Sequence, residues 1–328
     1  MVIGTEQRRA SAAYRRLGTS HIRATIPAVT RPVQHHLVSA GYQRNFGTPD
    51  RRLDIVDART GEVIQERRAI RNNWRQEHWH SVFDPSTGAV DTSLEEVFSK
   101  IESKALDAIR HVRIGQLTPD QAGAVINLFA IHLARSEMLR PWSDELSERE
   151  LPGIIQELSS SPRAIALFER EYGRLPNAGE LEAIAQRISD QRTVSGEWRR
   201  DTIARNHDGV VERLQALYIQ IIEVDSDLPG LVLGDVPVVH ANLADGRFGY
   251  RDRLAIGDAE LIMGPLTRRV LICFSATPDA HVRIATKRKL HAVLNLLIRA
   301  SVREIGCHPD DRLNLQRVCR NPPPLGRP

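Results

Sequence analysis

The stretch from Gln34 to Phe46 holds residues whose types could support catalysis. It places His36, Tyr42 and Arg44 within ten residues of one another, with a second histidine beside the first. An imidazole exchanges protons near neutral pH, and a guanidinium is a good partner for a phosphate group. The alternative interpretation is a pair of surface histidines next to aromatic rings that anchor the segment in the core.

Two carboxylates occupy positions where an acid would be held rigidly. Glu102 lies on the flank of the apolar stripe of a helix expected over 93–112, and Arg135, at the end of the next helix, is a candidate partner. A half-buried carboxylate needs such a partner, so Glu102 is either half of a structural ion pair or a metal ligand or general base. Asp235 follows an apolar strand and precedes Pro237. It is either a site acid at a strand end or a turn residue that caps its own backbone.

A third candidate is the pair His78 and His80, which flank Trp79. On a strand both imidazoles would point the same way and could bind one metal ion. An aromatic-rich edge or loop is the alternative, because no third ligand lies nearby in the sequence. The sequence has no glycine-rich nucleotide loop, no His-Glu-x-x-His motif and no nucleophile elbow, and so lacks the signatures of the best-known cofactor enzymes and hydrolases.

Strands at both ends of the chain and helices between them must position these residues. Apolar and polar residues alternate over 52–57 and 62–70 on either side of Thr60-Gly61, which predicts a β-hairpin. From Thr92 to about residue 223 the apolar residues recur every three or four positions, which indicates helices. Within this region, Thr118 before Pro119 is typical of a helix start.

After residue 223 the pattern returns to strands. Apolar runs over 230–234, 260–263 and 269–275 predict buried strands, and a last helix is expected over about 280–305. Strands, then helices, then strands without regular βαβ alternation indicate the α+β class. We expect a mixed or antiparallel sheet built from N-terminal and C-terminal strands, with 52–70 and 231–275 sharing one sheet. The largely helical middle, about 92–223, would cover it.

Length and composition are those of a globular protein, with 328 residues, 41% hydrophobic and 26% charged. We expect a basic, disordered arm over 1–31, a single α+β domain over 32–312 and a Pro-rich tail over 313–328. A mitochondrial targeting segment is the alternative for the arm. Three cysteines cannot form a closed disulfide framework, which favours a reducing cytoplasm. No apolar run approaches the ~18 residues of a membrane helix, so we expect no membrane partner.

Basic charge is concentrated near the N-terminus. The first 80 residues hold 14 arginines and seven acids, a net charge of +7 that exceeds the +4 of the whole chain. A basic region of this kind can grip phosphates without sequence preference, which indicates nucleic acid as a partner. Apart from this concentration, the excess of arginine over lysine in the whole chain, 41 to 4, is typical of a GC-rich genome.

The motifs, taken in order, resemble a bacterial family known as domain of unknown function 4238. The family's opening motif is His-x-x-Pro-x-x-Tyr-Leu-Arg-x-Phe, with Ser39 and Gln43 as the departures in this sequence. The resemblance extends over about residues 34–305 and implies one domain and a bacterial, cytoplasmic protein. The matching positions are His36, Tyr42, Arg44, Phe46, Ile101-Glu102, Arg135-Ser136, Gly234–Val238, Pro265–Arg268 and Asn295.

The resemblance also implies that these scattered polar residues converge in the fold. A cluster with this composition would suit a metal-assisted phosphodiester hydrolase, for example a nuclease that acts in host defence or as a toxin. In such a site His36, Glu102 and Asp235 would be catalytic, and Glu102 and Asp235 would also bind Mg²⁺ or Mn²⁺. Arg44 and Arg135 would bind the phosphate. Asn295 and Tyr42 would support these residues. The alternatives are a nucleic-acid-binding module without catalysis and a partner-binding protein whose polar cluster only fixes the fold.

Overall fold

The computed structural model describes residues 34–77, 79, 81–83, 89–112, 117–136, 138, 140–276 and 281–322. The arm expected over 1–31, His78 and His80 lie outside the described residues, as does the end of the expected tail from residue 323.

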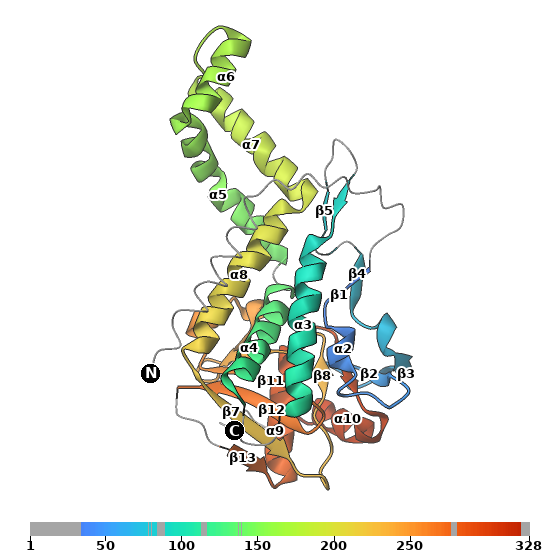
Figure 1. The fold of residues 1–328 in the computed structure, drawn as a ribbon. Coiled ribbons are helices and arrows are strands. Elements are labelled where there is room, and N and C mark those ends of the chain that lie inside the picture. Colours follow the sequence, from blue (N-terminus) through green and yellow to red (C-terminus); the bar gives the residue numbers. More distant parts are fainter. Residues whose placement is uncertain are drawn as a thin grey trace.

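The protein is an α+β protein with two principal sheets (Figure 1). The larger has six strands. All neighbours in it are antiparallel except the parallel pair β7–β13, so the sheet is mixed. Its spatial order is β10 (Arg247–Phe248), β9 (Val239–Asn242), β11 (Leu261–Pro265), β12 (Val270–Ser275), β7 (Tyr218–Val224) and β13 (His281–Ile284).

The second sheet joins the two ends of the chain, as the sequence predicts. Antiparallel pairing connects β3 (Val63–Ala69), β2 (Arg52–Asp57), β14 (Glu304–Cys307) and β8 (Leu233–Gly234) in that order. The prediction that all of 231–275 shares this sheet is wrong. Only β8 does so, because β11 and β12 find their partners in β9 and β7 instead.

The predicted hairpin is confirmed as β2 and β3. Its turn is fixed locally, because the Asp57 carboxylate accepts hydrogen bonds from the backbone N–H groups of Arg59 and Thr60, at 2.9 and 2.7 Å. Gly61 completes the turn at φ 71°, a left-handed conformation that glycine adopts without strain.

Two short ribbons and one helical turn stand beside the main sheets. β1 (Gln34–His36) pairs with β4 (Arg75–Glu77), and β5 (Val82–Phe83) pairs with β6 (Val90–Asp91). In the first ribbon His36 is directly opposite Arg75. The short helix α2 (Ala40–Gln43) follows β1, and the Ser39 hydroxyl caps it.

Three long helices of the middle region pack together: α3 (Ser93–His111), α4 (Pro119–Ala134) and α8 (Glu197–Gln215). α4 begins at a complete capping box, in which Thr118 and Gln121 each bond the other's backbone N–H. The α4 side chain Phe129 reaches β11 where Gly264 leaves room. A Cβ at Gly264 would lie 2.8 Å from the ring, so only glycine allows this approach.

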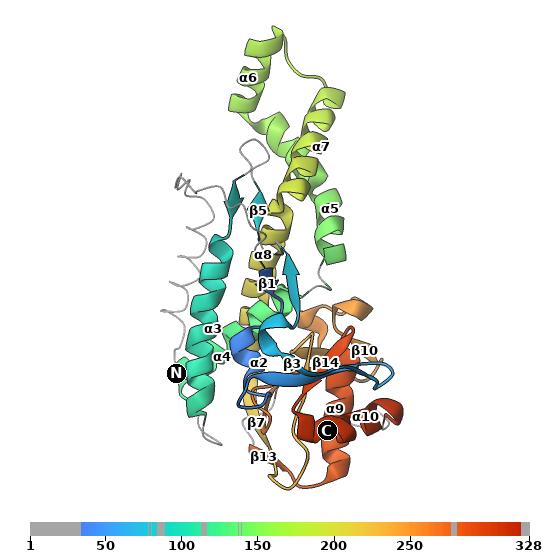
Figure 2. The same ribbon diagram turned by 90° about the vertical axis from the view of Figure 1, so that its right-hand side faces the viewer.

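Helices α5 (Arg140–Ser160), α6 (Pro162–Tyr172) and α7 (Ala178–Ser195) project away from the sheets in both views (Figures 1 and 2). Apolar side chains are exposed near the tip of this projection. Leu167, Tyr172 and Leu175 are 45%, 60% and 61% exposed.

The C-terminal region differs from expectation in two places. The last long helix, α9 (Lys287–Ala300), ends before residue 305, and residues 304–307 form β14 instead. Part of the expected Pro-rich tail is the helix α10 (Arg312–Arg320), which packs against α9 and buries Leu315 and Val318.

The helical middle also ends earlier than residue 223. Residues 218–224 form β7, which pairs with β12 from Tyr218 to Glu223. Pairing with a distant strand therefore makes this segment a strand, and the spacing of its apolar residues does not reveal that pairing. Within the described residues no helix is long and apolar enough to cross a membrane.

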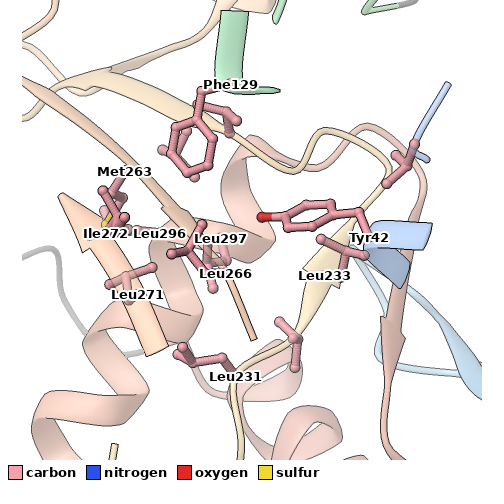
Figure 3. Packing of buried hydrophobic residues seen from close by; sticks show 14 of the residues in the cluster. Tyr42, Phe129, Leu231, Leu233, Met263, Leu266, Leu271, Ile272, Leu296 and Leu297 are labelled. Carbon is pink, nitrogen blue, oxygen red and sulfur yellow. The ribbon is translucent and has the colours of Figure 1, made fainter. Parts of the chain in front are cut away.

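The hydrophobic core joins the helices to both sheets. Figure 3 shows the Tyr42 ring among apolar side chains that include Phe129, Leu266 and Leu297. These side chains come from α2, α4, the turn after β11, and α9. The polar cluster described next lies against this core.

Candidate functional site

The centre of the candidate site is an ion pair between two neighbouring helices. Arg135, directly after α4, places Nη1 2.7 Å from Oε1 of Glu102 on α3. Arg135 is 2% exposed and the Glu102 side chain 19% exposed, and the Arg135 guanidinium also lies 5.8 Å from the centre of the Phe98 ring. The predicted partnership of Glu102 and Arg135 is confirmed, and it sits where water is largely excluded.

His132, one turn earlier on α4, accepts a second hydrogen bond from Arg135. The Arg135 Nη2 atom lies 3.1 Å from His132 Nδ1. Because a guanidinium has only donors, Nδ1 must be the unprotonated nitrogen and the ring is neutral with its proton on Nε2. Burial holds the pKa of His132 well below its usual range, and the positive charge of Arg135 lowers it further.

His36 belongs to the same electrostatic neighbourhood. Burial lowers the pKa of the His36 imidazole, and the charges of Arg75 and Arg135 lower it further. The backbone of Arg71 and the charge of Glu102 act in the opposite direction without reversing the shift. The structure thus places His36 within the electrostatic influence of Glu102 and Arg135 and favours a neutral His36.

An acid–histidine contact borders this cluster. Nδ1 of buried His35 lies 3.5 Å from Oε1 of Glu95, which stands on α3 two turns before Glu102. Burial raises the pKa of Glu95; the charge of Arg135 opposes that shift and the charge of Glu102 reinforces it. Trp79 closes the other side, because its indole N–H donates to the backbone carbonyl of Arg135 at 2.9 Å.

Tyr42 supports the cluster from the core side. Its ring lies 5.1 Å from the His132 ring, centre to centre, at a tilt of 30°. Its hydroxyl donates to the backbone carbonyl of Pro265 at the end of β11, and burial raises the pKa of the hydroxyl. Tyr42 therefore holds α2, α4 and the larger sheet together, which suits its predicted supporting role.

Asp235 has a different set of partners. Its Oδ1 accepts a hydrogen bond from the backbone N–H of Val302 at 2.8 Å, and its Oδ2 accepts from Arg303 and Glu304 at 2.8 and 3.1 Å. Burial raises the pKa of this carboxyl, while the three N–H groups act in the opposite direction. Asp235 thus holds the loop between α9 and β14 in place. It caps backbone N–H groups, as one alternative predicted, but those of a distant segment and not of its own turn.

Two predicted site residues remain, Arg44 at the end of α2 and Asn295 on α9. Arg44 is exposed at the C-terminal end of α2, and no contact links it to Glu102 or Arg135 among the described residues. Asn295 is buried in α9, at 1% exposure. Their predicted phosphate-binding and supporting roles stay predictions, as does the metal pair His78 and His80.

The predicted metal pair, Glu102 and Asp235, shares no partner in this arrangement. Oε1 of Glu102 bonds Arg135, whereas both oxygens of Asp235 face backbone N–H groups. Within the part of the chain that the structure describes, no group of three or more histidine, cysteine or acidic side chains is placed to hold a metal ion. Binding of Mg²⁺ or Mn²⁺ by these carboxylates stays a prediction.

Comparison with known proteins places the chain in a family. The family model "Protein of unknown function (DUF4238)" matches residues 34–311. The chain belongs to this family. The DUF4238 match contains every predicted site residue and the two sheets almost entirely. Neither the curated proteins nor the solved structures gave a match.

Sequence reasoning missed His132 and Arg75. His132 has a detectable signal, because it precedes Arg135 by three residues and such positions share a helix face. Arg75 has none, since it reaches His36 only through the pairing of β1 with β4. The DUF4238 site is thus an imidazole beside two guanidiniums and a carboxylate, a set able to move a proton next to a bound anion.

Proposed function

We propose that this DUF4238 protein hydrolyses phosphodiesters, with nucleic acid as the substrate class and His36 as the general base. The supporting observation is that His36 lies within the electrostatic influence of Arg75, Arg135 and Glu102 with its pKa lowered. A base must be unprotonated before it acts, and a neutral imidazole meets that condition at pH 7.

The two arginines near His36 have different surroundings and are given different roles. Arg135 is buried and already bonds Glu102 and His132, so its role is to fix the positions of those side chains. Arg75 is exposed on β4, and within the described residues no carboxylate forms an ion pair with it. Arg75 is therefore the arginine proposed to contact the substrate phosphate, as guanidinium does in many phosphate sites.

Glu102 is proposed to act through its second oxygen. Because Oε1 is bonded to Arg135, Oε2 is the oxygen left to orient a water molecule or to bind a divalent cation. If Mg²⁺ or Mn²⁺ takes part, it would supply charge stabilisation at the phosphate. Asp235 would reach the ion only by giving up backbone hydrogen bonds, so chelation and cation addition are part of the test.

The test measures cleavage of short single-stranded RNA and DNA labelled with a fluorophore and a quencher. The wild type is compared with His36→Gln and with His111→Gln, an exposed histidine on α3 that serves as the matched control. Each is assayed with EDTA, Mg²⁺ and Mn²⁺. We expect His36→Gln to lose at least 100-fold in rate, the usual contribution of an acid–base group, and His111→Gln to match the wild type.

Two results would refute the proposal. One is equal cleavage by His36→Gln and the wild type, which would assign the activity to a contaminant. The other is no cleavage of either nucleic acid under any of the three cation conditions. Circular dichroism and urea unfolding of both variants verify that loss of activity is not loss of folding.

A second candidate function is nucleic-acid binding without catalysis. Exposed arginines on and around the β2–β3 hairpin favour it, among them Arg51, Arg59 and Arg67. Binding through such contacts releases counterions, so the dissociation constant should rise steeply between 50 and 200 mM salt. Tight binding with no cleavage in the assay above would select this function, and a salt-independent affinity would exclude it.

A further inference from the structure

A pocket of about 380 Å³ opens beside the polar cluster, between β4 and the loop that Asp235 clamps. Its walls come from five segments: Leu37 after β1, Arg68 on β3, the region of Asn72 to Gln76, Asp235 and Val236 after β8, and Val302 to Glu304. This volume is within the range of pockets that bind small molecules, although the lining is more polar than usual.

Three arginines line the pocket: Arg68, Arg75 and Arg303. Arg68 is held in place, since its Nη2 donates to the Asn72 carbonyl at 2.8 Å and its Nη1 lies 3.7 Å from a Glu304 oxygen. Arg75 donates to the Arg71 carbonyl at 3.2 Å, a neutral partner that leaves its positive charge uncompensated.

The two acids in the wall leave the lining with an excess of one positive charge, three arginines against two carboxylates. Asp235 directs both oxygens to backbone N–H groups of the loop, and Glu304 lies beside Arg68. Because Glu304 lies beside Arg68 while Arg75 bonds only a neutral carbonyl, the lining favours a negatively charged occupant that accepts hydrogen bonds at Arg75.

Strain and unmet hydrogen-bonding capacity next to the pocket point to a missing partner. Trp74 has φ 45°, which is rare for a bulky residue. Its indole N–H is buried without a hydrogen-bond partner in the described structure, and so are both amide atoms of fully buried Asn73. Such groups are costly, and backbone strain of this kind gathers at ligand sites.

We propose that this pocket holds the phosphate group of a nucleotide, with Arg75 and Arg68 as its main contacts. A nucleoside monophosphate is of a size to fill it, and it is the repeating unit of the substrate proposed above. The inference rests on the proposed function only in taking nucleic acid as the substrate class. Binding of a mononucleotide can be measured without any turnover.

The pocket is coupled to His36 through the β1–β4 ribbon. Arg75 is directly opposite His36 in the strand register, and its charge lowers the pKa of His36. A phosphate bound to Arg75 would compensate that charge, so occupancy should make His36 more basic. Substrate binding would then strengthen the base that acts on it.

The experiment is calorimetric titration of adenosine monophosphate into the full chain, with adenosine as the uncharged comparison. Arg75→Gln and Arg68→Gln are compared with Arg163→Gln, an exposed arginine on α6 far from β4. We expect adenosine to bind at least tenfold more weakly than the monophosphate. Each pocket variant should weaken monophosphate binding at least tenfold, and Arg163→Gln should leave it unchanged.

A second readout follows the His36 imidazole by NMR during a pH titration, with and without the monophosphate. Its pKa should rise when the ligand is bound in the wild type and stay constant in Arg75→Gln. Because Arg75 is exposed, this variant is expected to fold even if Arg68→Gln, which loses its contact with Glu304, does not.

The outcomes separate the two proposals. Equal affinity for adenosine and its monophosphate, or unchanged affinity in Arg75→Gln, would overturn the pocket assignment even if the protein cleaves nucleic acid. Conversely, monophosphate binding that depends on Arg75 would uphold the pocket even if no phosphodiester is cleaved.

Discussion

Replacing Glu102 by alanine should destabilise the protein by about 3 kcal/mol. The change removes the carboxylate that Arg135 Nη1 contacts at 2.7 Å, while the guanidinium stays buried at 2% exposure. Breaking one partner of a buried pair typically costs about 3–5 kcal/mol, because the other charge is left uncompensated. The lower end applies here, since the Glu102 side chain is 19% exposed and water can partly replace it.

A double-mutant cycle isolates the pair from the rest of the cluster. Glu102→Leu, Arg135→Met and the double variant are compared by urea unfolding at pH 7. The double variant should be at least about 2 kcal/mol more stable than the sum of the single effects predicts, because it leaves neither charge buried alone. The exposed pair Asp107 and Arg110, at 3.1 Å, is the control, and Asp107→Ala should change stability by no more than about 0.5 kcal/mol.

The reasoning fails if Glu102→Ala lies within about 0.5 kcal/mol of the wild type. It also fails if the single effects add, because additivity would mean that Glu102 and Arg135 do not stabilise each other.

Three further predictions concern single residues. Burial lowers the pKa of His240 from its ordinary 6.5 to about 4, so the folded state resists protonation of this side chain and stability is lost as pH falls from about 6.5 towards 4. Between pH 7 and 4.5 the free energy of unfolding should drop about 2–3 kcal/mol less in His240→Gln than in the wild type. Equal drops in the two proteins would contradict this prediction. Asp235→Asn should cost about 2–4 kcal/mol in urea unfolding, because an amide offers one acceptor to three N–H groups; if Asp235 instead binds Mg²⁺, adding the ion should stabilise the wild type and not the variant. Gly234→Ala would place a Cβ 2.0 Å from the Ser301 hydroxyl oxygen and should cost about 1–3 kcal/mol of stability. In the control Gly153→Ala, on α5, the new Cβ would meet nothing within 4 Å, so this variant should be neutral or stabilise the protein by up to about 1 kcal/mol. Similar effects of the two substitutions in thermal unfolding would contradict the packing argument.

Local signals predicted the elements whose hydrogen bonds are themselves local. The hairpin turn at Asp57 to Gly61 and the capping box at Thr118 both follow from side chains that bond the adjacent backbone. The sequence pattern predicts a helix where β7 forms, because only pairing with the distant strand β12 distinguishes a strand there. The predicted last helix includes part of β14 for the same reason. β14 has only four residues, which are too few to show a period, and its partners β2 and β8 are distant in the sequence.

The candidate site likewise contains contacts that the sequence predicts and contacts that depend on distant partners. The partnership of Glu102 and Arg135 was predictable because the two residues belong to consecutive helices, and consecutive elements usually lie side by side. That Asp235 clamps the loop at Val302 was not predictable, because the loop lies 67 residues away. The place of Arg75 depends on a ribbon of three residues a strand, and no pattern in the sequence marks it.

The pairing of β2 with β14 has a consequence for how the protein is made. Asp57 pairs with Glu304, so this sheet is completed only after the chain has been translated as far as β14, 247 residues beyond Asp57. At about 5–20 residues per second, the apolar strand β2 waits roughly 10–50 s on the ribosome with one edge unpaired. An unpaired strand edge is prone to aggregate, so we expect co-expressed chaperones to raise the soluble yield of this protein.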